Sequence, residues 1–182
     1  MQSARKKVRF NYHDYQLFPA DKRYEIIDGD SHMVPAPNTH HQKISRNLEL
    51  ILWDFVKKRN LGEVLDAPVD VILSNEDIVQ PDLVFISKKR LGILTEKNVI
   101  GAPDLVVEIL SPSTKNLDKD IKRKLYEKYG VLEYWIVDPD GASVEVLQMT
   151  DDGLKNFRTF PKGTHVQSPL LPELKFLVDE IF

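Results

Sequence analysis

Residues 101–114 read GAPDLVVEILSPST, and they contain the segment that decides the fold. Five of the six residues in LVVEIL (105–110) are apolar, and the sixth is Glu108. A short apolar run of this kind, bounded by Gly, Pro and Ser, is typical of a strand that is buried on both faces. The sequence therefore predicts a central strand over 104–110, which ends at SPST (111–114).

A charged helix and a further strand are predicted after this central strand. The helix, over 117–129, carries apolar residues on one face, at Ile121, Leu125 and Tyr129. Gly130 is suited to end it. The apolar run YWIV (134–137) then predicts another strand. Because a helix crosses over between the two strands, we expect them to be parallel.

The segments upstream of the central strand predict one helix and two strands. Apolar residues recur at helical spacing over 40–60, at Ile44, Leu48, Ile51, Leu52 and Phe55. Asn38 or Thr39 can cap this helix, and Gly62 can end it. Strands are expected over 63–73 (EVLDAPVDVIL) and 82–86 (DLVFI), followed by a loop or short helix over 88–101. The core order is thus helix, three strands, helix, strand.

The predicted fold class is α/β with a mixed sheet, in one domain that spans residues 1–182. An N-terminal hairpin (22–36) is expected from the Asp28-Gly29 turn, which pairs 24–28 with 31–34. The core then spans about 38–140. A C-terminal strand meander (141–182) contains strands near 144–149 and 157–160, and its Leu- and Phe-rich end can dock on its own core or on a partner.

Composition excludes several classes of function. The chain has 182 residues and no cysteine, which excludes disulfide frameworks, Cys-type zinc sites, iron–sulfur clusters and a thiol nucleophile. No stretch approaches the roughly 18 apolar residues of a membrane span, so we expect a cytoplasmic protein. The net charge of −3 means that nucleic-acid binding requires a local patch. Phosphate-loop, HExxH and GxSxG motifs are absent from the sequence.

Three carboxylates occur inside the predicted strands: Asp70, Asp82 and Glu108. A buried carboxylate is costly unless it is protonated, paired or bound to a metal. If the three strands are neighbours, the carboxylates converge, and convergent oxygen ligands suit a hard cation such as Mg²⁺. The alternative is an edge-strand position or a salt bridge for Glu108, and an ordinary surface role for Asp70. Asp104, at a strand start, is expected to be exposed.

The helix after Glu108 is rich in cations, with Lys115, Lys119, Lys122, Arg123, Lys124 and Lys128. Such a run is usually a solvated helix face. A lysine on its inner edge, however, could reach the carboxylates, where an ammonium can stabilise a pentacoordinate phosphate or position an attacking water.

At this level of detail the chain resembles the Uma family of restriction-endonuclease-like proteins, within the PD-(D/E)XK nuclease superfamily. The resemblance covers roughly residues 10–180. It rests on YEIIDG (24–29), HHQKI (40–44), APVDVIL (67–73), VQPDLVFIS (79–87), GAPDLVVEILSPST (101–114) and KRKLYEKYGVLEYWIVDP (122–139). It implies a restriction-endonuclease-like core of helix, three strands, helix and strand, in agreement with the pattern derived from periodicity.

The resemblance also implies catalytic residues. Asp82 matches the acid of the PD element, and Glu108 matches the acid of the (D/E)XK element. The lysine expected two residues after Glu108 is replaced by Leu110, and Lys122 on the following helix matches the position that takes its role. Lys124 is the alternative lysine. It lies about 200° further round the helix, so the two cannot both face the site.

The implied chemistry is phosphodiester hydrolysis assisted by Mg²⁺ or Mn²⁺, with DNA as the expected substrate. Asp82, Glu108 and the carbonyl of Ile109 are the expected metal ligands. Glu25 and His41 match recurrent family positions, as outer ligands or substrate contacts. The alternatives for them are a hairpin residue and a helix-start residue.

Two other interpretations stay open at this point. One is a catalytically inactive nuclease-fold module that binds nucleic acid or a protein, and the other is a salt-bridged core without a ligand. A homodimer is expected if both strands of a duplex are cut. The sequence leaves open the choice between DNA and RNA, the target sequence and the biological role.

Overall fold

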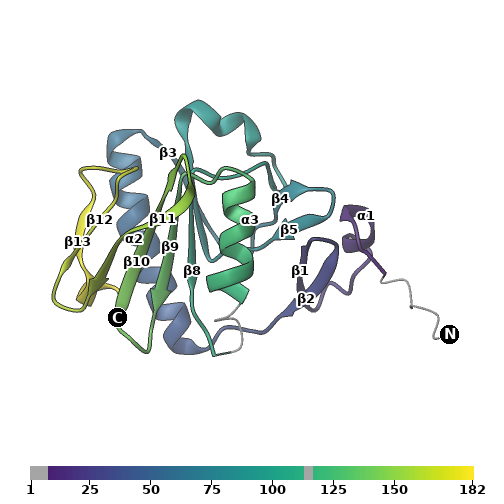
Figure 1. Ribbon diagram of the computed structural model, residues 1–182, viewed down its shortest axis with the longest axis horizontal. Helices are drawn as coiled ribbons and strands as arrows, with labels where there is room; N and C mark the ends of the chain where they lie inside the picture. Colours follow the sequence, from purple (N-terminus) through teal and green to yellow (C-terminus); the bar gives the residue numbers. More distant parts are fainter. Residues whose placement is uncertain (1–7, 113–116) are drawn as a thin grey trace.

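The central strand predicted over 104–110 lies inside a six-stranded sheet (Figure 1). The computed structural model describes residues 8–112 and 117–182. Neighbouring strands of this sheet are antiparallel except β8 and β9, whose parallel pairing confirms the prediction from the helical crossover. In spatial order the strands are β11 (Gly153–Pro161), β10 (Ser143–Thr150), β9 (Glu133–Asp138), β8 (Leu105–Ile109), β6 (Leu83–Ser87) and β3 (Gly62–Asp66).

A second sheet of five short strands lies beside it and contains the predicted N-terminal hairpin. Its order is β2 (Asp30–Val34), β1 (Arg23–Ile27), β5 (Asp77–Val79), β4 (Val71–Ser74) and β7 (Val99–Ile100). A two-stranded ribbon, β12 (His165–Gln167) and β13 (Lys175–Leu177), follows the predicted C-terminal meander of β10 and β11.

The helices cover both faces of the six-stranded sheet, which explains why its central strands are apolar throughout. The long α2 (Thr39–Arg59) packs on one face and the short α3 (Arg123–Lys128) on the other (Figure 1). Alternate residues of β8 therefore enter different cores: Leu105, Val107 and Ile109 face α2, whereas Val106, and Leu110 just after the strand, pack on the α3 side. Glu108 shares the α3 side by the same alternation.

The remaining helical segments are short. These are α1 (Tyr12–Tyr15), the 3₁₀ turns η1 (Lys88–Ile93) and η3 (Val178–Glu180), and the π-helical turn η2 (Leu117–Lys122), which runs directly into α3. The single α-helix predicted over 117–129 is therefore a π-helical turn followed by an α-helix. No helix in the described ranges combines the length and apolar character that crossing a lipid bilayer requires.

Two boundaries differ from the sequence prediction for identifiable reasons. The strand predicted over 63–73 is two strands, β3 and β4, in different sheets, because Pro68 between them has no N–H to donate to a ladder. Helix α2 begins after the Asn38 cap, as predicted, but it ends at Asn60, which is left-handed at φ 53°. Gly62 instead lets β3 approach the carbonyl of Ile86 closely, where a Cβ would collide.

The apolar C-terminal residues dock on the chain's own core. Leu171, Leu174 and Phe176 are buried in the cluster that α2 covers, with Leu170 and Phe182 packed at its margin. The buried carboxylate of Glu133 accepts hydrogen bonds from Ser168 Oγ (2.6 Å) and Leu170 N (2.8 Å), which ties this tail to β9.

Candidate active site

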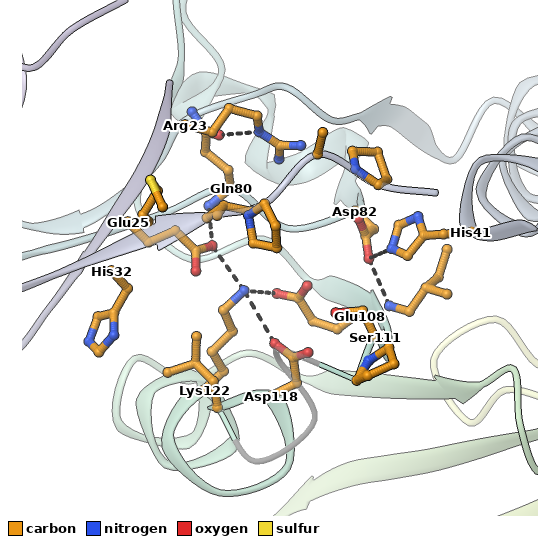
Figure 2. A pocket seen from close by; sticks show the side chains of 18 of the residues that line it. Arg23, Glu25, His32, His41, Gln80, Asp82, Glu108, Ser111, Asp118 and Lys122 are labelled. Carbon is orange, nitrogen blue, oxygen red and sulfur yellow. Dashed lines mark hydrogen bonds and ion pairs between the residues drawn. The ribbon is translucent and has the colours of Figure 1, made fainter. Parts of the chain in front are cut away.

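Carboxylates from both sheets meet in one pocket, which we call the carboxylate pocket (Figure 2). Asp82 lies just before β6 and Glu108 near the end of β8. Because Leu83 pairs with Val107, the antiparallel register continued by one residue sets Asp82 opposite Glu108. Glu25 reaches the pocket from β1. The pocket has a volume of about 180 Å³.

A buried lysine lies among these acids. The ammonium of Lys122, at the end of η2, contacts three carboxylates: Glu25 at 2.9 Å, Glu108 at 3.0 Å and Asp118 at 3.4 Å. All four side chains are at most 5% exposed. Asp118 lies four residues before Lys122, so one helical turn presents the acid and the base together. Such π turns are frequent at functional sites.

The carboxylate pocket holds more acidic side chains than lysine and arginine side chains, and burial together with this excess of acids shifts the pKa values of Glu108 and Lys122. Burial raises the pKa of Glu108 well above its ordinary value; the charge of Lys122 opposes the rise, and the neighbouring carboxylates add to it. Burial alone would lower the pKa of Lys122, but the surrounding carboxylates outweigh it and raise this pKa. Several carboxylates thus share one ammonium, an arrangement that favours an additional cation.

The carboxyl group of Glu108 is also held by a tyrosine. Tyr126, which is fully buried on α3, donates its hydroxyl to Glu108 Oε1 at 2.7 Å. Burial and the charge of Glu108 raise the pKa of this hydroxyl, so it stays protonated as a donor. Tyr126 lies one helical turn after Lys122, and both side chains face the same strand.

Asp82 has a separate set of partners. Its Oδ2 accepts the backbone N–H of Ile109 at 2.7 Å and lies 3.1 Å from His41 Nε2 (Figure 2). Burial acts to lower the pKa of His41, but its hydrogen bond to Asp82 and the charge of that carboxylate outweigh burial, so the pKa is raised. The backbone of Ile109 acts in the same direction. His41 thus stabilises the Asp82 carboxylate most strongly when it is protonated.

The donor chemistry of the pocket fits a hard divalent cation. Every acidic ligand offers oxygen, and Glu25 Oε2 is buried without a hydrogen-bond partner among the described residues. Within residues 8–112 and 117–182, no three His, Asp or Glu side chains converge closely enough to form a metal-binding cluster. The reason is visible in Figure 2: Lys122 lies between the carboxylates, and His41 engages Asp82.

The structure separates the predicted site residues into two groups. Glu25, His41, Asp82, Glu108, Ile109 and Lys122 all line the carboxylate pocket. Leu110, in the position of the missing lysine, is buried in the core on the α3 side. Lys124 is exposed, so of the two candidate lysines only Lys122 lies among the acids.

Asp70 does not join the other two strand carboxylates. Its Oδ1 accepts the Tyr15 hydroxyl at 2.6 Å and Gln80 Nε2 at 2.7 Å, and it lines a neighbouring cavity. The expected convergence of three carboxylates fails because Asp70 precedes β4, which lies between β5 and β7 in the five-stranded sheet and is not a neighbour of β6. Asp104 is buried rather than exposed, since Ser87 N and Arg90 donate to its carboxylate.

Sequence reasoning missed three residues of the site: Asp118, Tyr126 and Gln80. Gln80 N donates to Glu25 Oε1 at 2.8 Å, which fixes that carboxylate. The spacing of Asp118 and Tyr126 could have indicated their role, because each lies four residues from Lys122 and therefore on the same helix face.

Comparisons with known proteins found a matching family model and curated relatives. Residues 11–179 match the family Uma2, described as "Putative restriction endonuclease". Two curated relatives from Synechocystis sp. (strain ATCC 27184 / PCC 6803 / Kazusa) align over 134 residues. Uncharacterized protein slr1290 is 25% identical, covering 72% of this chain and 69% of its own length. Uncharacterized protein sll1609 is 24% identical, covering 73% and 76% respectively.

A solved structure shares the fold. The crystal structure of a protein from Anabaena variabilis ATCC 29413, titled a putative nuclease belonging to DUF820, matches with a TM-score of 0.79. The match covers 95% of this chain and 97% of that chain at 19% identity.

Proposed function

Since this chain belongs to the Uma2 family of putative restriction endonucleases, we propose that it is a metal-dependent endonuclease that hydrolyses phosphodiester bonds of DNA. Family membership and the restriction-endonuclease-like fold support nuclease function in general. The use of a divalent metal and the choice of DNA are parts of the proposal. The observation that carries it is the meeting of Asp82, Glu108 and Lys122, from three separate chain segments, in one negatively charged pocket.

In this proposal Asp82, Glu108 and the carbonyl of Ile109 hold Mg²⁺ or Mn²⁺, and Glu25 supplies a further oxygen. A bound metal of this kind lowers the pKa of a coordinated water and neutralises charge on a phosphoryl oxygen. Without a metal, the contacts of Glu108 with Lys122 and of Asp82 with His41 offset the cost of burying these carboxylates.

The chain's own groups would orient the reactants. Lys122 contacts Glu25, Glu108 and Asp118. An ammonium has three donors, so Lys122 would donate to the attacking water or to a non-bridging phosphate oxygen by exchanging one of these contacts. Tyr126 and Gln80 fix the carboxylates of Glu108 and Glu25, which limits the reorganisation needed when charge develops. In the hydrolysis, the water oxygen bonds to phosphorus as the leaving oxygen departs with a proton.

The test is nicking of supercoiled plasmid in Mg²⁺ or Mn²⁺, with EDTA as one control. Glu108→Gln should reduce the rate by at least about 100-fold, because even outer partners of metal ligands cost about 10–100-fold. Glu173→Gln, at an exposed carboxylate, is the matched variant that should keep full activity. Cleavage that survives both EDTA and Glu108→Gln would refute the proposal.

A second candidate is a nuclease-fold module that binds its partner without catalysis. It is favoured by one observation, namely that Lys122 and His41 already neutralise part of the acidic cluster. Nucleic-acid binding without cleavage, under every metal tested, would support it. If calorimetry detects binding of neither a metal nor nucleic acid, the result would instead support a salt-bridged core without a ligand.

The proposal also includes a homodimer and a cytoplasmic location. One active site per chain cuts one strand, so double-strand cleavage needs two copies. The apolar C-terminal residues pack on their own core, so a dimer would have to use another surface. Sedimentation of the full chain with and without DNA tests the dimer, and linear plasmid as an early product would support it.

A further inference from the structure

A second cavity adjoins the carboxylate pocket and shares part of its wall. We call it the aromatic cavity, and its volume is about 550 Å³. Arg23 and Gln80 line both cavities, so the two are neighbours (Figure 2 shows both residues from the carboxylate side). Its other principal side chains are Tyr12, Tyr15, Phe18, Tyr24, Asp70 and Lys97.

Four aromatic rings give this cavity flat apolar surfaces. Tyr12 and Tyr15 lie nearly parallel, with ring centroids 6.3 Å apart and 18° between their planes. Phe18 packs edge-on against Tyr24, at 4.9 Å between centroids. All four rings are half-buried rather than enclosed, so each keeps accessible surface. A nucleobase stacks on such surfaces whatever its identity, because every base has a π-face.

A chain of hydrogen bonds fixes the polar side of the cavity. Arg23 Nε donates to Gln80 Oε1 at 2.8 Å, and Gln80 Nε2 donates to Asp70 Oδ1 at 2.7 Å. Tyr15 donates to the same Asp70 oxygen at 2.6 Å. A carboxylate held in place by two donors can accept from an amino group on the edge of a base. None of these contacts is used in the proposed hydrolysis.

Three cations line the aromatic cavity. Lys22 and Lys97 are exposed, and Arg23 lies at the wall between the two cavities. In a chain with a net charge of −3, this is a local concentration of positive charge next to the carboxylate pocket. Aromatic rings combined with a positively charged edge are the features by which proteins bind single-stranded nucleic acid.

We propose that the aromatic cavity binds the unpaired nucleobase adjacent to the phosphodiester in the carboxylate pocket. Arg23 then lies where the phosphate between the two nucleotides passes. This inference rests on the proposed nuclease function and narrows its substrate to nucleic acid that is single-stranded, or unpaired, at the site of cleavage.

Binding of fluorescein-labelled DNA decamers to the full chain in EDTA tests this, with fluorescence anisotropy as the readout. The single strand should bind more tightly than its duplex. Replacing one nucleotide at a time with an abasic one should weaken binding at one position by between about five-fold and about 150-fold, the range for loss of one stacked base. The double variant Tyr12→Leu/Phe18→Leu should lose that positional dependence. Phe157→Leu, at an exposed aromatic on β11, should keep it.

A second pair of variants avoids the risk of unfolding. Lys22→Gln/Lys97→Gln changes exposed side chains and should make the slope of log affinity against log salt shallower by about 1.4, since each phosphate contact to a single strand contributes about 0.7. The matched control Lys155→Gln/Lys175→Gln, also at exposed lysines, should leave the slope unchanged.

The results separate this inference from the proposed function. The base-binding subsite would be overturned if the two lysine double variants had equal salt-dependence slopes. It would also be overturned if Tyr12→Leu/Phe18→Leu and Phe157→Leu showed the same dependence of affinity on the position of the abasic nucleotide. Plasmid nicking that depends on Glu108 would then still support the nuclease. Failure of every decamer to bind would overturn the subsite as well, and the nicking assay would decide the proposed function independently.

Discussion

Replacing Lys122 with methionine should destabilise the protein in a manner that depends on pH. The substitution keeps the volume of the stem and removes the ammonium that contacts Glu25, Glu108 and Asp118 at 2.9–3.4 Å. Removing one partner of a buried ion pair costs about 3–5 kcal/mol, because the other charge is left uncompensated. The whole domain has only about 5–15 kcal/mol of stability, so the loss at pH 8 is a large fraction of it.

The loss should shrink as the pH falls. Burial already raises the pKa of Glu108 in the folded protein, and the ammonium of Lys122 opposes that rise. Without the ammonium the folded-state pKa of Glu108 rises further above its unfolded value. The folded variant then binds a proton that the unfolded chain does not, so its stability increases from pH 8 to pH 5. Lys122 is charged throughout this range in the wild type, because its own pKa is raised.

Urea unfolding at pH 8 and pH 5 measures both effects, with the fluorescence of the buried Trp135 as the readout. Lys124→Met, two positions along the same segment and exposed, should change stability by less than about 0.5 kcal/mol. Adding Glu108→Gln to Lys122→Met should restore part of the stability at pH 8, because one buried negative charge is removed. An equal loss at the two pH values, without rescue, would refute the reasoning.

Two further predictions concern the partners of the two central acids, and a third concerns the cap of α2. The raised pKa of His41 means that its contribution is present below its unfolded pKa and is lost as the pH rises through the folded value. His41→Asn should therefore cost more stability at pH 5.5 than at pH 8 in urea titrations, and a larger cost at pH 8 would contradict the pairing with Asp82. Tyr126→Phe removes a hydrogen bond to the Glu108 carboxylate and should cost about 1.5–3 kcal/mol in the same assay, with a fall in cleavage rate that no change in substrate affinity explains. Asn38→Ala removes the side-chain cap of α2 and should cost about 1 kcal/mol, whereas Asn38→Ser should cost much less; equal losses would argue against the cap.

The central layer of the fold was predictable because its elements are long or strongly patterned. Strand β8 was evident from five apolar residues in six, and α2 from apolar residues at helical spacing with a capping Asn38. The parallel pairing of β8 with β9 followed from the crossover alone. These features depend on local pattern and chain connectivity, which a sequence carries directly.

The five-stranded sheet was not predictable in the same way. Strand β5 has three residues and β7 has two, which is too short for any period to be recognised. The split of 63–73 was signalled by Pro68, but the sequence does not indicate that the second half joins another sheet. The position of Asp70 followed from that split.

The candidate site was predictable as far as its acids and its lysine are concerned. The resemblance to the Uma family indicated Asp82, Glu108 and Lys122, and all three line one pocket in the structure. It also indicated Lys122 rather than Lys124; helical spacing alone showed only that the two lysines cannot both face the site. The role of Tyr126 was not predicted, because its hydroxyl is recognised as a partner only once Glu108 lies 2.7 Å away.

The carboxylate pocket is assembled from distant segments of the chain, and this has a consequence for the synthesis of the protein on the ribosome. Glu25 emerges early, but its ammonium partner Lys122 follows about 100 residues later, after about 5–20 seconds of synthesis at typical rates. During that interval the Glu25 carboxylate lacks its contact with the Lys122 ammonium, although Gln80 N, which donates to Glu25 Oε1, has already been synthesised. The pocket that we propose to be catalytic therefore cannot be complete until residue 122 has been synthesised.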